Sequence, residues 1–280
     1  MSGGFLAEMA AGSRARVHAA RLRVAEGELA ERAARTPAPP LLRLSADGFD
    51  LIAELKLRSP AAGRLDTGAA TAAELAGRVT AYASAGAAAV SVLTEPSRFD
   101  GELEHLTAAA RALAPLAVPA MRKDFLVDPY QVLEARVAGA GGVLVIVRML
   151  SRAAIDALVD CARAHGLFVL LEAFDAHDIE RLHDVVGTYA HGATLLAGVN
   201  CRDLATLEVV PQRLTELAPL LPLGVPRVAE SGVTGAADAR AVAACGYTLA
   251  LVGSALMRGP DPGSLARTLL AAGRSARRMS

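Results

Sequence analysis

The chain has 280 residues, of which 53% are hydrophobic and 4% aromatic, and its 29 basic residues equal its 29 acidic residues. This charge balance argues against a nucleic-acid partner, which a basic surplus usually marks, and the apolar content excludes an intrinsically disordered chain. No apolar run approaches the ~18 residues that a membrane span needs, so we expect no membrane partner either.

Residues 1–35 are rich in Ala, Arg, Glu and Leu, and this composition predicts a helix. The segment Thr36-Pro-Ala-Pro-Pro40 then breaks the helical pattern and is typical of a linker. The N-terminus shows no apolar signal segment, and three widely spaced cysteines indicate reduced thiols, so we expect a cytoplasmic protein. We divide the chain into an N-terminal helical extension with its linker, 1–48, and one domain, 49–280.

From Phe49 onward, short apolar runs alternate with longer amphipathic runs. The apolar runs predict strands at 50–56, 89–94, 119–125, 142–149, 168–174, 195–200, 226–231 and 248–253. The amphipathic runs predict helices at 70–86, 102–114, 129–140, 151–165, 175–186, 210–221, 235–245 and 262–273. Apolar strands that are each followed by a helix indicate a parallel sheet covered by helices. The repetition predicts an α/β fold of the (β/α)8 TIM-barrel class, and the missing Gly-x-Gly-x-x-Gly fingerprint argues against a Rossmann domain.

Polar side chains stand where several predicted strands end, which is where such barrels carry their active sites. Glu54 and Lys56 share one face of the first strand, because side chains alternate in direction along a strand. Lys123 ends the third strand with the parity of Met121 and Phe125.

The later strands repeat this pattern. Glu172 lies near the end of the fifth strand, Asn200 closes the sixth with Arg202 two residues on, and Glu230 closes the seventh. A charged group inside an apolar strand is costly unless it is paired. These residues therefore indicate either an active site or a set of structural ion pairs at the barrel mouth.

Two glycine-bearing loops follow the seventh and eighth strands, Glu230-Ser-Gly-Val-Thr234 and Val252-Gly-Ser-Ala-Leu-Met257. Barrels often bind phosphate with these two loops and the N-terminus of a short helix. The alternative is that both loops are ordinary tight turns between a strand and a helix.

The basic residues are unevenly divided, since Lys56 and Lys123 are the only lysines beside 27 arginines, and Asn200 is the sole asparagine. All three stand at predicted strand ends. One interpretation is that arginine has replaced lysine wherever only a positive charge was needed. The two lysines would then remain because their positions need a compact ammonium group.

Several segments in the same order resemble the indole-3-glycerol phosphate synthase family over roughly residues 49–273. They are Ile52-Ala-Glu-Leu-Lys-Leu-Arg-Ser-Pro60, Ser91-Val-Leu-Thr-Glu-Pro96, Arg122-Lys-Asp-Phe125, Asp128-Pro-Tyr-Gln131, Gly198-Val-Asn-Cys-Arg-Asp-Leu204, Ala229-Glu-Ser-Gly232 and Leu251-Val-Gly-Ser-Ala-Leu-Met-Arg258. The resemblance implies conversion of 1-(2-carboxyphenylamino)-1-deoxyribulose 5-phosphate to indole-3-glycerol phosphate, carbon dioxide and water. It implies no metal and no organic cofactor, in agreement with histidines and cysteines that show no metal-site spacing.

The resemblance also implies roles. Lys123 would be the general acid, Glu172 the general base, Lys56 the ligand of the substrate carboxylate, Glu54 the residue that orients Lys56, and Asn200 the holder of the substrate hydroxyls. Which lysine donates at which step is left open. Lysine suits the acid role because burial and neighbouring cations can lower its pKa, whereas arginine stays protonated.

The remaining expected site residues fall into three groups. Arg202 and Glu230 would organise the site. An apolar wall would hold the anthranilate ring, formed by Phe99, Phe125, Leu144, Leu204 and Leu251. The phosphate would be bound by Ser59, Ser231, Gly232, Gly253 and Ser254.

The sequence departs from the family in three places. Ala61 replaces a usual serine, and the stretch 182–195 is longer than usual. Phe174 stands where a polar residue is more common and, by strand parity, is expected to face the barrel mouth. These departures leave room for a paralogue that acts on a modified anthranilate. Two further alternatives are another phosphate-binding barrel, such as phosphoribosylanthranilate isomerase, and a non-catalytic paralogue. The oligomeric state stays open, with a monomer slightly favoured.

Overall fold

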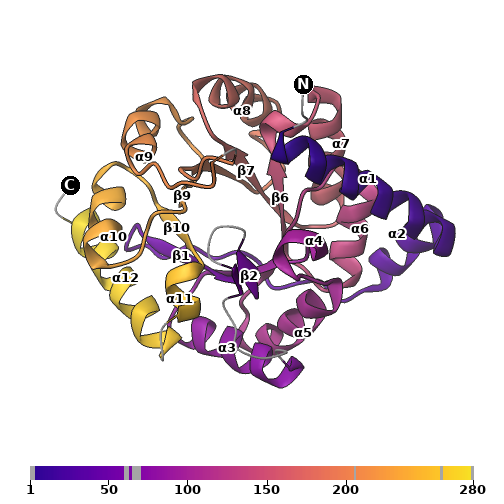
Figure 1. The fold of residues 1–280 in the computed structure, drawn as a ribbon, viewed down its shortest axis with the longest axis horizontal. Helices are drawn as coiled ribbons and strands as arrows, with labels where there is room; N and C mark the ends of the chain where they lie inside the picture. Colours follow the sequence, from indigo (N-terminus) through magenta and orange to yellow (C-terminus); the bar gives the residue numbers. More distant parts are fainter. Residues whose placement is uncertain (1–3, 60–62, 65–70, 205, 259–260, 279–280) are drawn as a thin grey trace.

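The computed structural model describes residues 4–59, 63–64, 71–204, 206–258 and 261–278. Within them, eight parallel strands close into a barrel in the order β1-β10-β9-β8-β7-β6-β5-β4 (Figure 1). Their bounds are β1 (Asp50–Leu55), β4 (Ala89–Leu93), β5 (Ala120–Lys123), β6 (Gly142–Ile146), β7 (Phe168–Ala173), β8 (Leu195–Asn200), β9 (Arg227–Glu230) and β10 (Leu249–Val252). The predicted (β/α)8 barrel is confirmed.

The barrel is surrounded by helices that follow the strands along the chain (Figure 1). They are α3 (Ala72–Ser84), α5 (Leu103–Leu113), α6 (Pro129–Val137), α7 (Arg152–Ala164), α8 (Ala176–Tyr189), α9 (Gln212–Leu217), α10 (Ala236–Ala244) and α12 (Pro262–Arg277). Short elements that the sequence did not predict follow several strands: β2 (Arg58–Ser59), β3 (Gly63–Arg64), α4 (Pro96–Phe99), η2 (Val147–Met149) and α11 (Ser254–Arg258). Two further short 3-10 helices are η1 (Ala114–Leu116) and η3 (Ala218–Leu220).

Alternating strand residues build two separate apolar layers. Leu51 and Val169 point outward and pack with the surrounding helices. Ile52 and Leu170, one residue further along, belong to a second cluster inside the barrel. This two-residue alternation is why the inward polar residues at the strand ends all face one space.

The predicted helical N-terminal extension is confirmed, but it forms two helices, α1 (Phe5–Arg23) and α2 (Glu26–Arg35), where the sequence indicated one. Val24 leaves the helical region with φ −137° and ψ 118°. Its carbonyl oxygen accepts a hydrogen bond from the Tyr130 hydroxyl at 3.0 Å. The break lets α2 turn and pack on α6.

Two predicted strands end two or more residues earlier than expected. The strand predicted over 119–125 stops at Lys123, because the Asp124 side chain accepts the backbone N–H of Phe125 at 2.8 Å and turns the chain out of the sheet. The strand predicted over 142–149 stops at Ile146, where η2 begins.

The long stretch 182–195 continues α8 to Tyr189, beyond the predicted end at residue 186, and then turns into β8 at Leu195. Leu182, Val185 and Tyr189 are buried on this part of α8. The stretch therefore consists mainly of packed helix and the turn that precedes β8.

Among the described residues, no helix has the length and apolar content to cross a membrane. Cys161, Cys201 and Cys245 carry free thiols.

We predict opposite effects for two glycine-to-alanine substitutions in helices. At Gly273 in α12 a Cβ would lie 2.1 Å from the ring of buried Phe49, so Gly273→Ala should destabilise the fold by about 1–3 kcal/mol. At Gly77 in α3 a Cβ would meet no atom within 4 Å, so Gly77→Ala should stabilise by about 0.5–1 kcal/mol. Urea unfolding at 25 °C measures both. A stabilising Gly273→Ala substitution would contradict this packing.

Candidate active site

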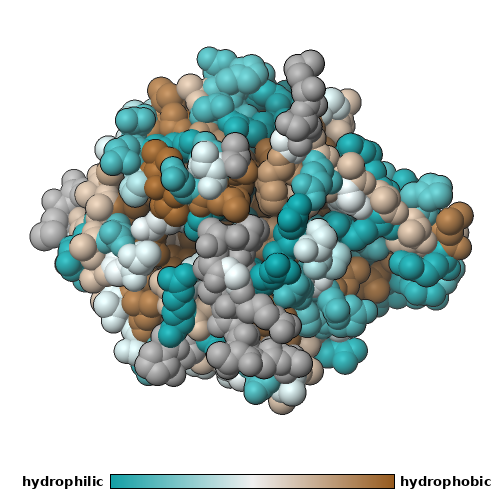
Figure 2. Space-filling view, in the orientation of Figure 1, coloured by the Kyte–Doolittle hydropathy of each residue, from teal (hydrophilic) through white to brown (hydrophobic). Residues whose placement is uncertain are grey.

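A cavity of about 430 Å³ opens at the carboxyl ends of the barrel strands. Figure 2 shows the same face, with apolar residues gathered above and to the left of its centre. The side chain of Ser59 and all of Ala61 lie outside the described residues. Every other predicted site residue lines the cavity: Glu54, Lys56, Phe99, Lys123, Phe125, Leu144, Glu172, Asn200, Arg202, Leu204, Glu230, Ser231, Gly232, Leu251, Gly253 and Ser254.

Lys123 lies between two carboxylates that come from two other strands. Its Nζ is 3.1 Å from Glu172 Oε2 and 3.5 Å from Glu230 Oε2. Burial lowers the pKa of Lys123, but the negative charges of Glu172, Glu230 and Glu54 outweigh burial, so the pKa is raised. The expectation of a lowered lysine pKa is therefore wrong for this arrangement, and Lys123 carries its proton at neutral pH.

Lys56 and Glu54 form a second ion pair, with 2.7 Å between Nζ and Oε1. Burial raises the pKa of Glu54, but Lys56 and then Lys123 act more strongly together, so the pKa is lowered. A Cβ at Gly253 would lie 2.2 Å from Glu54 Oε1. Glycine at this position therefore gives the ion pair the room it needs beside β10.

The pKa of Glu230 is raised, in contrast to the lowered pKa of Glu54. Burial and the adjacent charge of Glu172 raise its pKa well above the ordinary value, although Lys123 acts in the opposite direction. Glu230 Oε1 is buried and has no hydrogen-bond partner among the described residues. A Cβ at Gly198 would lie 2.2 Å from this oxygen, so glycine is needed there too. Glu230 is therefore easier to protonate than an ordinary glutamate.

Asn200 connects the end of β8 to the loop that follows β9. Its Oδ1 accepts hydrogen bonds from the backbone N–H of Arg202 and from Ser231 Oγ, both at 2.9 Å. The Arg202 guanidinium donates to the carbonyl of Leu207 at 2.6 Å. These bonds fix the orientation of the Asn200 amide at the cavity.

The loop after β9 has an unusual backbone. Ser231 has φ +68° and Gly232 has φ +76°, so two successive residues are left-handed. For an L-residue such as serine this costs roughly 1–2 kcal/mol. Backbone strain of this kind clusters at binding sites, where surrounding contacts hold it in place. The neighbouring loop after β10 leads directly into α11 at Ser254.

The apolar wall is larger than the sequence indicated. The Phe99 and Phe125 rings lie 6.2 Å apart, and the ring of Phe5 meets Phe125 edge-on at 5.8 Å. Phe5 and Ile146 both line the cavity, yet neither was predicted. Ile146 has the inward parity of Leu144 and could have been found by that signal. Phe5 had no such signal, because the sequence does not say where the N-terminal helix packs.

Two further residues differ from expectation. Arg258 lines the cavity from the end of α11, and its place in the last matching segment was an available signal.

Phe174 was expected to face the mouth, but it does not line the cavity. Its ring is buried beneath the Arg148 guanidinium, which lies 4.7 Å from the ring centroid.

Two lysines, three buried carboxylates and two glycine-bearing loops thus surround one partly apolar cavity. This arrangement defines a (β/α)8-barrel enzyme that transfers protons on a substrate with an anionic group and an apolar part. A family model described as indole-3-glycerol phosphate synthase matches residues 6–269. The chain belongs to the indole-3-glycerol phosphate synthase family, whose members are carbon–carbon lyases of tryptophan biosynthesis that act on a small phosphorylated substrate.

Individual relatives agree with this assignment. Indole-3-glycerol phosphate synthase of Mycolicibacterium gilvum is 40% identical over 94% of this chain and 92% of its own length. The enzyme of the same name from Parafrankia sp. is 42% identical over 88% of this chain and 87% of its own length. The predicted family, function and enzyme class are confirmed. The isomerase alternative is not supported.

Solved structures show the same fold at low sequence identity. The 3-hexulose-6-phosphate synthase of Salmonella typhimurium superposes with a TM-score of 0.61 at 15% identity, over 81% of this chain and 100% of that one. At this identity the likeness concerns the barrel alone.

We predict that Glu230→Gln becomes more stable relative to the wild type as pH rises. The raised pKa of Glu230 contributes stability that is present below its unfolded pKa of 4.5 and is lost as pH rises through the folded pKa. Glutamine keeps the shape without the proton, so the difference in unfolding free energy should grow by up to about 1.4 kcal/mol per pH unit in that window. Denaturant unfolding from pH 4.5 to 8 measures it. A difference that is independent of pH would show that Glu230 is ionised throughout.

Proposed function

We propose that the side chains around Lys123 carry out the ring closure of 1-(2-carboxyphenylamino)-1-deoxyribulose 5-phosphate. The observation that carries this assignment is the position of Lys123, whose ammonium group touches Glu172 and Glu230 within a cavity that also has an apolar wall. An acid, a base and an aromatic pocket are what the reaction requires. We further propose that the chain acts as a monomer in the cytoplasm, where its free thiols would stay reduced.

The cavity's chemistry suggests how the substrate lies. The anthranilate ring would pack among Phe99, Phe125 and Leu144, with its carboxylate on Lys56. The ribulose hydroxyls would meet Asn200. The phosphate would be held by the backbone N–H groups and hydroxyls after β9 and β10, at Ser231, Gly232, Gly253 and Ser254, with Arg258 nearby.

Ring closure begins at the ketone. Lys123 donates a proton to the ketone oxygen while the ring carbon that bears the carboxylate attacks the ketone carbon, so a carbon–carbon bond forms and the oxygen becomes a hydroxyl. The bond from the ring carbon to the carboxylate then breaks, and its electrons return to the ring as carbon dioxide leaves. The ion pair with Glu54 would keep Lys56 pointed at the carboxylate until this step.

Dehydration completes the indole. A second proton converts the hydroxyl into a leaving water molecule, and Glu172 removes a proton from the neighbouring carbon so that the double bond forms. Two protons are donated and one is removed, which matches the single proton that decarboxylation consumes overall. Lys56 is the candidate donor for the second proton.

The proposed acid, Lys123, and the proposed base, Glu172, influence each other because they are in direct contact. A raised pKa keeps Lys123 charged but makes it a weaker acid. Lys123 gives up its proton first, so Glu172 then loses the neighbouring cation and becomes a stronger base for the last step. The short contact between them thus couples the state of the acid to the strength of the base.

No specific observation favours a modified anthranilate as substrate. Phe174 was the departure most able to change the pocket, and it lies under Arg148 outside the cavity lining. The added length near residue 189 lies within α8. Neither departure places a side chain in the described part of the cavity lining.

We predict that Lys123→Arg loses activity by about 10²–10⁴-fold in kcat while the fold persists, because arginine keeps the charge but does not release the proton. Indole absorbance after mixing the purified chain with the carboxyphenylamino substrate measures turnover, and a thermal melt checks folding. Full activity in Lys123→Arg would remove Lys123 from the acid role.

Lys56→Arg is the matched comparison, because this substitution also exchanges ammonium for guanidinium beside a buried carboxylate. If Lys56 only binds the substrate carboxylate, the variant should raise KM with a small change in kcat. If Lys56 also donates the proton for dehydration, kcat should fall as well. The wild type showing no turnover with this substrate would contradict the proposed activity itself.

A further inference from the structure

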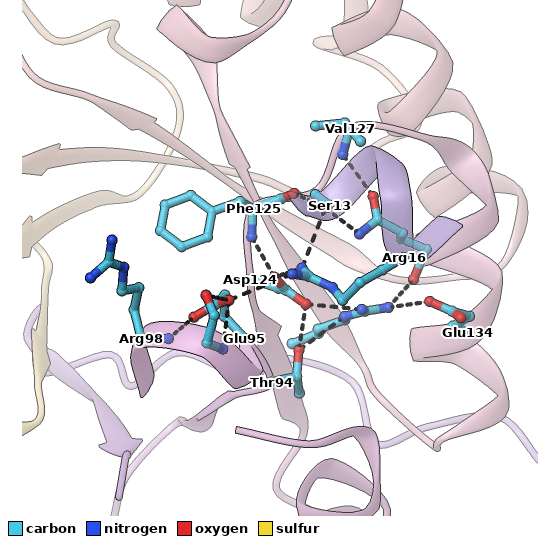
Figure 3. Close-up of polar contacts among 12 residues, drawn as sticks. Ser13, Arg16, Thr94, Glu95, Arg98, Asp124, Phe125, Val127 and Glu134 are labelled. Carbon is cyan, nitrogen blue, oxygen red and sulfur yellow. Dashed lines mark hydrogen bonds and ion pairs between the residues drawn. The ribbon is translucent and has the colours of Figure 1, made fainter. Parts of the chain in front are cut away.

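We propose that Arg16 and Asp124 are positioning residues for the active site, through which helix α1 holds Lys123 and Phe125 in place. The inference rests on the proposed function, which places Lys123 at the acid and Phe125 in the apolar wall. Figure 3 shows the contacts, which bring together residues of α1, the end of β4 and the end of β5. None of these contacts was visible in the sequence.

Asp124 follows Lys123 directly and is 2% exposed. Its Oδ1 accepts hydrogen bonds from Arg16 Nη2 at 2.7 Å and from the backbone N–H of Phe125 at 2.8 Å. Its Oδ2 accepts from Thr94 Oγ1 at 2.9 Å and from Arg122 Nη2 at 3.0 Å. Four donors from three parts of the chain therefore fix the residue between the proposed acid and the aromatic wall.

Phe125 is held at three points. Its N–H donates to Asp124, its carbonyl accepts from Ser13 Oγ at 2.5 Å, and its ring meets the ring of Phe5 edge-on at 5.8 Å. Ser13 and Phe5 both belong to α1. Ser13 Oγ also accepts a hydrogen bond from Gln131 Nε2 of α6 at 2.7 Å, so the serine connects Phe125 to the helix that follows it.

Arg16 reaches a second loop as well. Its Nη1 lies 3.5 Å from Glu95 Oε1. The Glu95 carboxylate caps α4 by accepting from the backbone N–H groups of Ser97 at 2.9 Å and Arg98 at 2.7 Å. Since α4 ends with Phe99, one guanidinium connects the two loops that carry the facing aromatic rings.

Besides connecting the loops, Arg16 supplies a positive charge to two buried carboxylates. The side chains of Asp124 and Glu95 are 0% and 1% exposed, and Arg16 is 31% exposed. Removing Arg16 leaves Arg122 as the cation bound to Asp124 and leaves Glu95 without its guanidinium contact. A buried carboxylate that loses its cation is left with an uncompensated charge, which is strongly destabilising. The loops that carry Phe99 and Phe125 would then move from their places.

A simpler explanation is that Arg16 only fastens α1 to the barrel. Arg21 provides the matched control, because it lies on the same helix and binds the same stretch of chain. It pairs with Asp128 at 2.8 Å and with Glu26 at 2.7 Å, and these contacts are exposed and outside the cavity. A general loss of helix docking would affect both arginines.

The test compares Arg16→Met, Arg16→Lys and Arg21→Met in the full chain, with kcat and KM measured by indole absorbance and folding by thermal melts. We expect Arg16→Met to lower kcat/KM roughly tenfold or more, with contributions from both kcat and KM, because loops that carry reacting and binding groups are displaced. Arg16→Lys should recover much of the loss, since it keeps a cation beside Asp124. Arg21→Met should stay within about twofold of the wild type, as expected for an exposed ion pair.

The inference is overturned if Arg16→Met keeps the wild-type kcat and KM, or if Arg21→Met loses as much activity as Arg16→Met. If Arg16→Met does not fold, Ser13→Ala decides the question, because it removes the hydrogen bond to the Phe125 carbonyl without changing charge. A raised KM in Ser13→Ala supports the inference and an unchanged KM overturns it. Failure of the proposed function is distinguishable, since the wild type itself would then show no turnover.

Discussion

The contact of the Lys123 ammonium group with the carboxylates of Glu172 and Glu230 is the interaction on which the site depends. The three residues come from β5, β7 and β9, and only closure of the barrel brings these separated strands face to face. Inside a buried space such attractions are far stronger than in water, and removing one partner leaves an uncompensated charge. The position of each carboxylate therefore constrains the others and the lysine between them.

The barrel accommodates these charges at specific positions. Glycine at 198 and 253 leaves room for the carboxylates of Glu230 and Glu54, which any side chain would displace. Ser231 keeps a strained left-handed backbone beside the same space. Buried charge and strain cost stability, and the extensive outer apolar layer between strands and helices offsets that cost. The polar end of the barrel is thus supported by an apolar framework built from the alternate residues of the same strands.

Strand parity predicted a large part of the site. The two-residue alternation placed Glu54, Lys123 and Glu172 on the inner side of their strands, and each lines the cavity. The docking of α1 could not be predicted in this way. The Ser13 hydroxyl bonds to the carbonyl of Phe125, 112 residues away, and a helical pattern carries no information about such a partner.

The sequence also did not predict that the pKa of Lys123 is raised. Its direction depends on how close three carboxylates lie to one ammonium group, and a list of residue types leaves those distances undefined. The short elements α4 and α11 were missed for a related reason, since four and five residues are too few to show a helical period. Both nevertheless contribute to the cavity lining, through Phe99 and Arg258.

The central claim is that carboxylates hold the proton on Lys123, and it can be measured directly because the chain has only two lysines. Labelling lysine with ¹³C at Cε gives two NMR signals, and Lys56→Arg assigns them. The Lys123 signal should titrate at a pH above the value of about 10.4 that is ordinary for lysine. Its midpoint should fall in Glu172→Gln, which removes the nearest negative charge. A Lys123 midpoint at or below the ordinary value, unchanged in Glu172→Gln, would contradict the account.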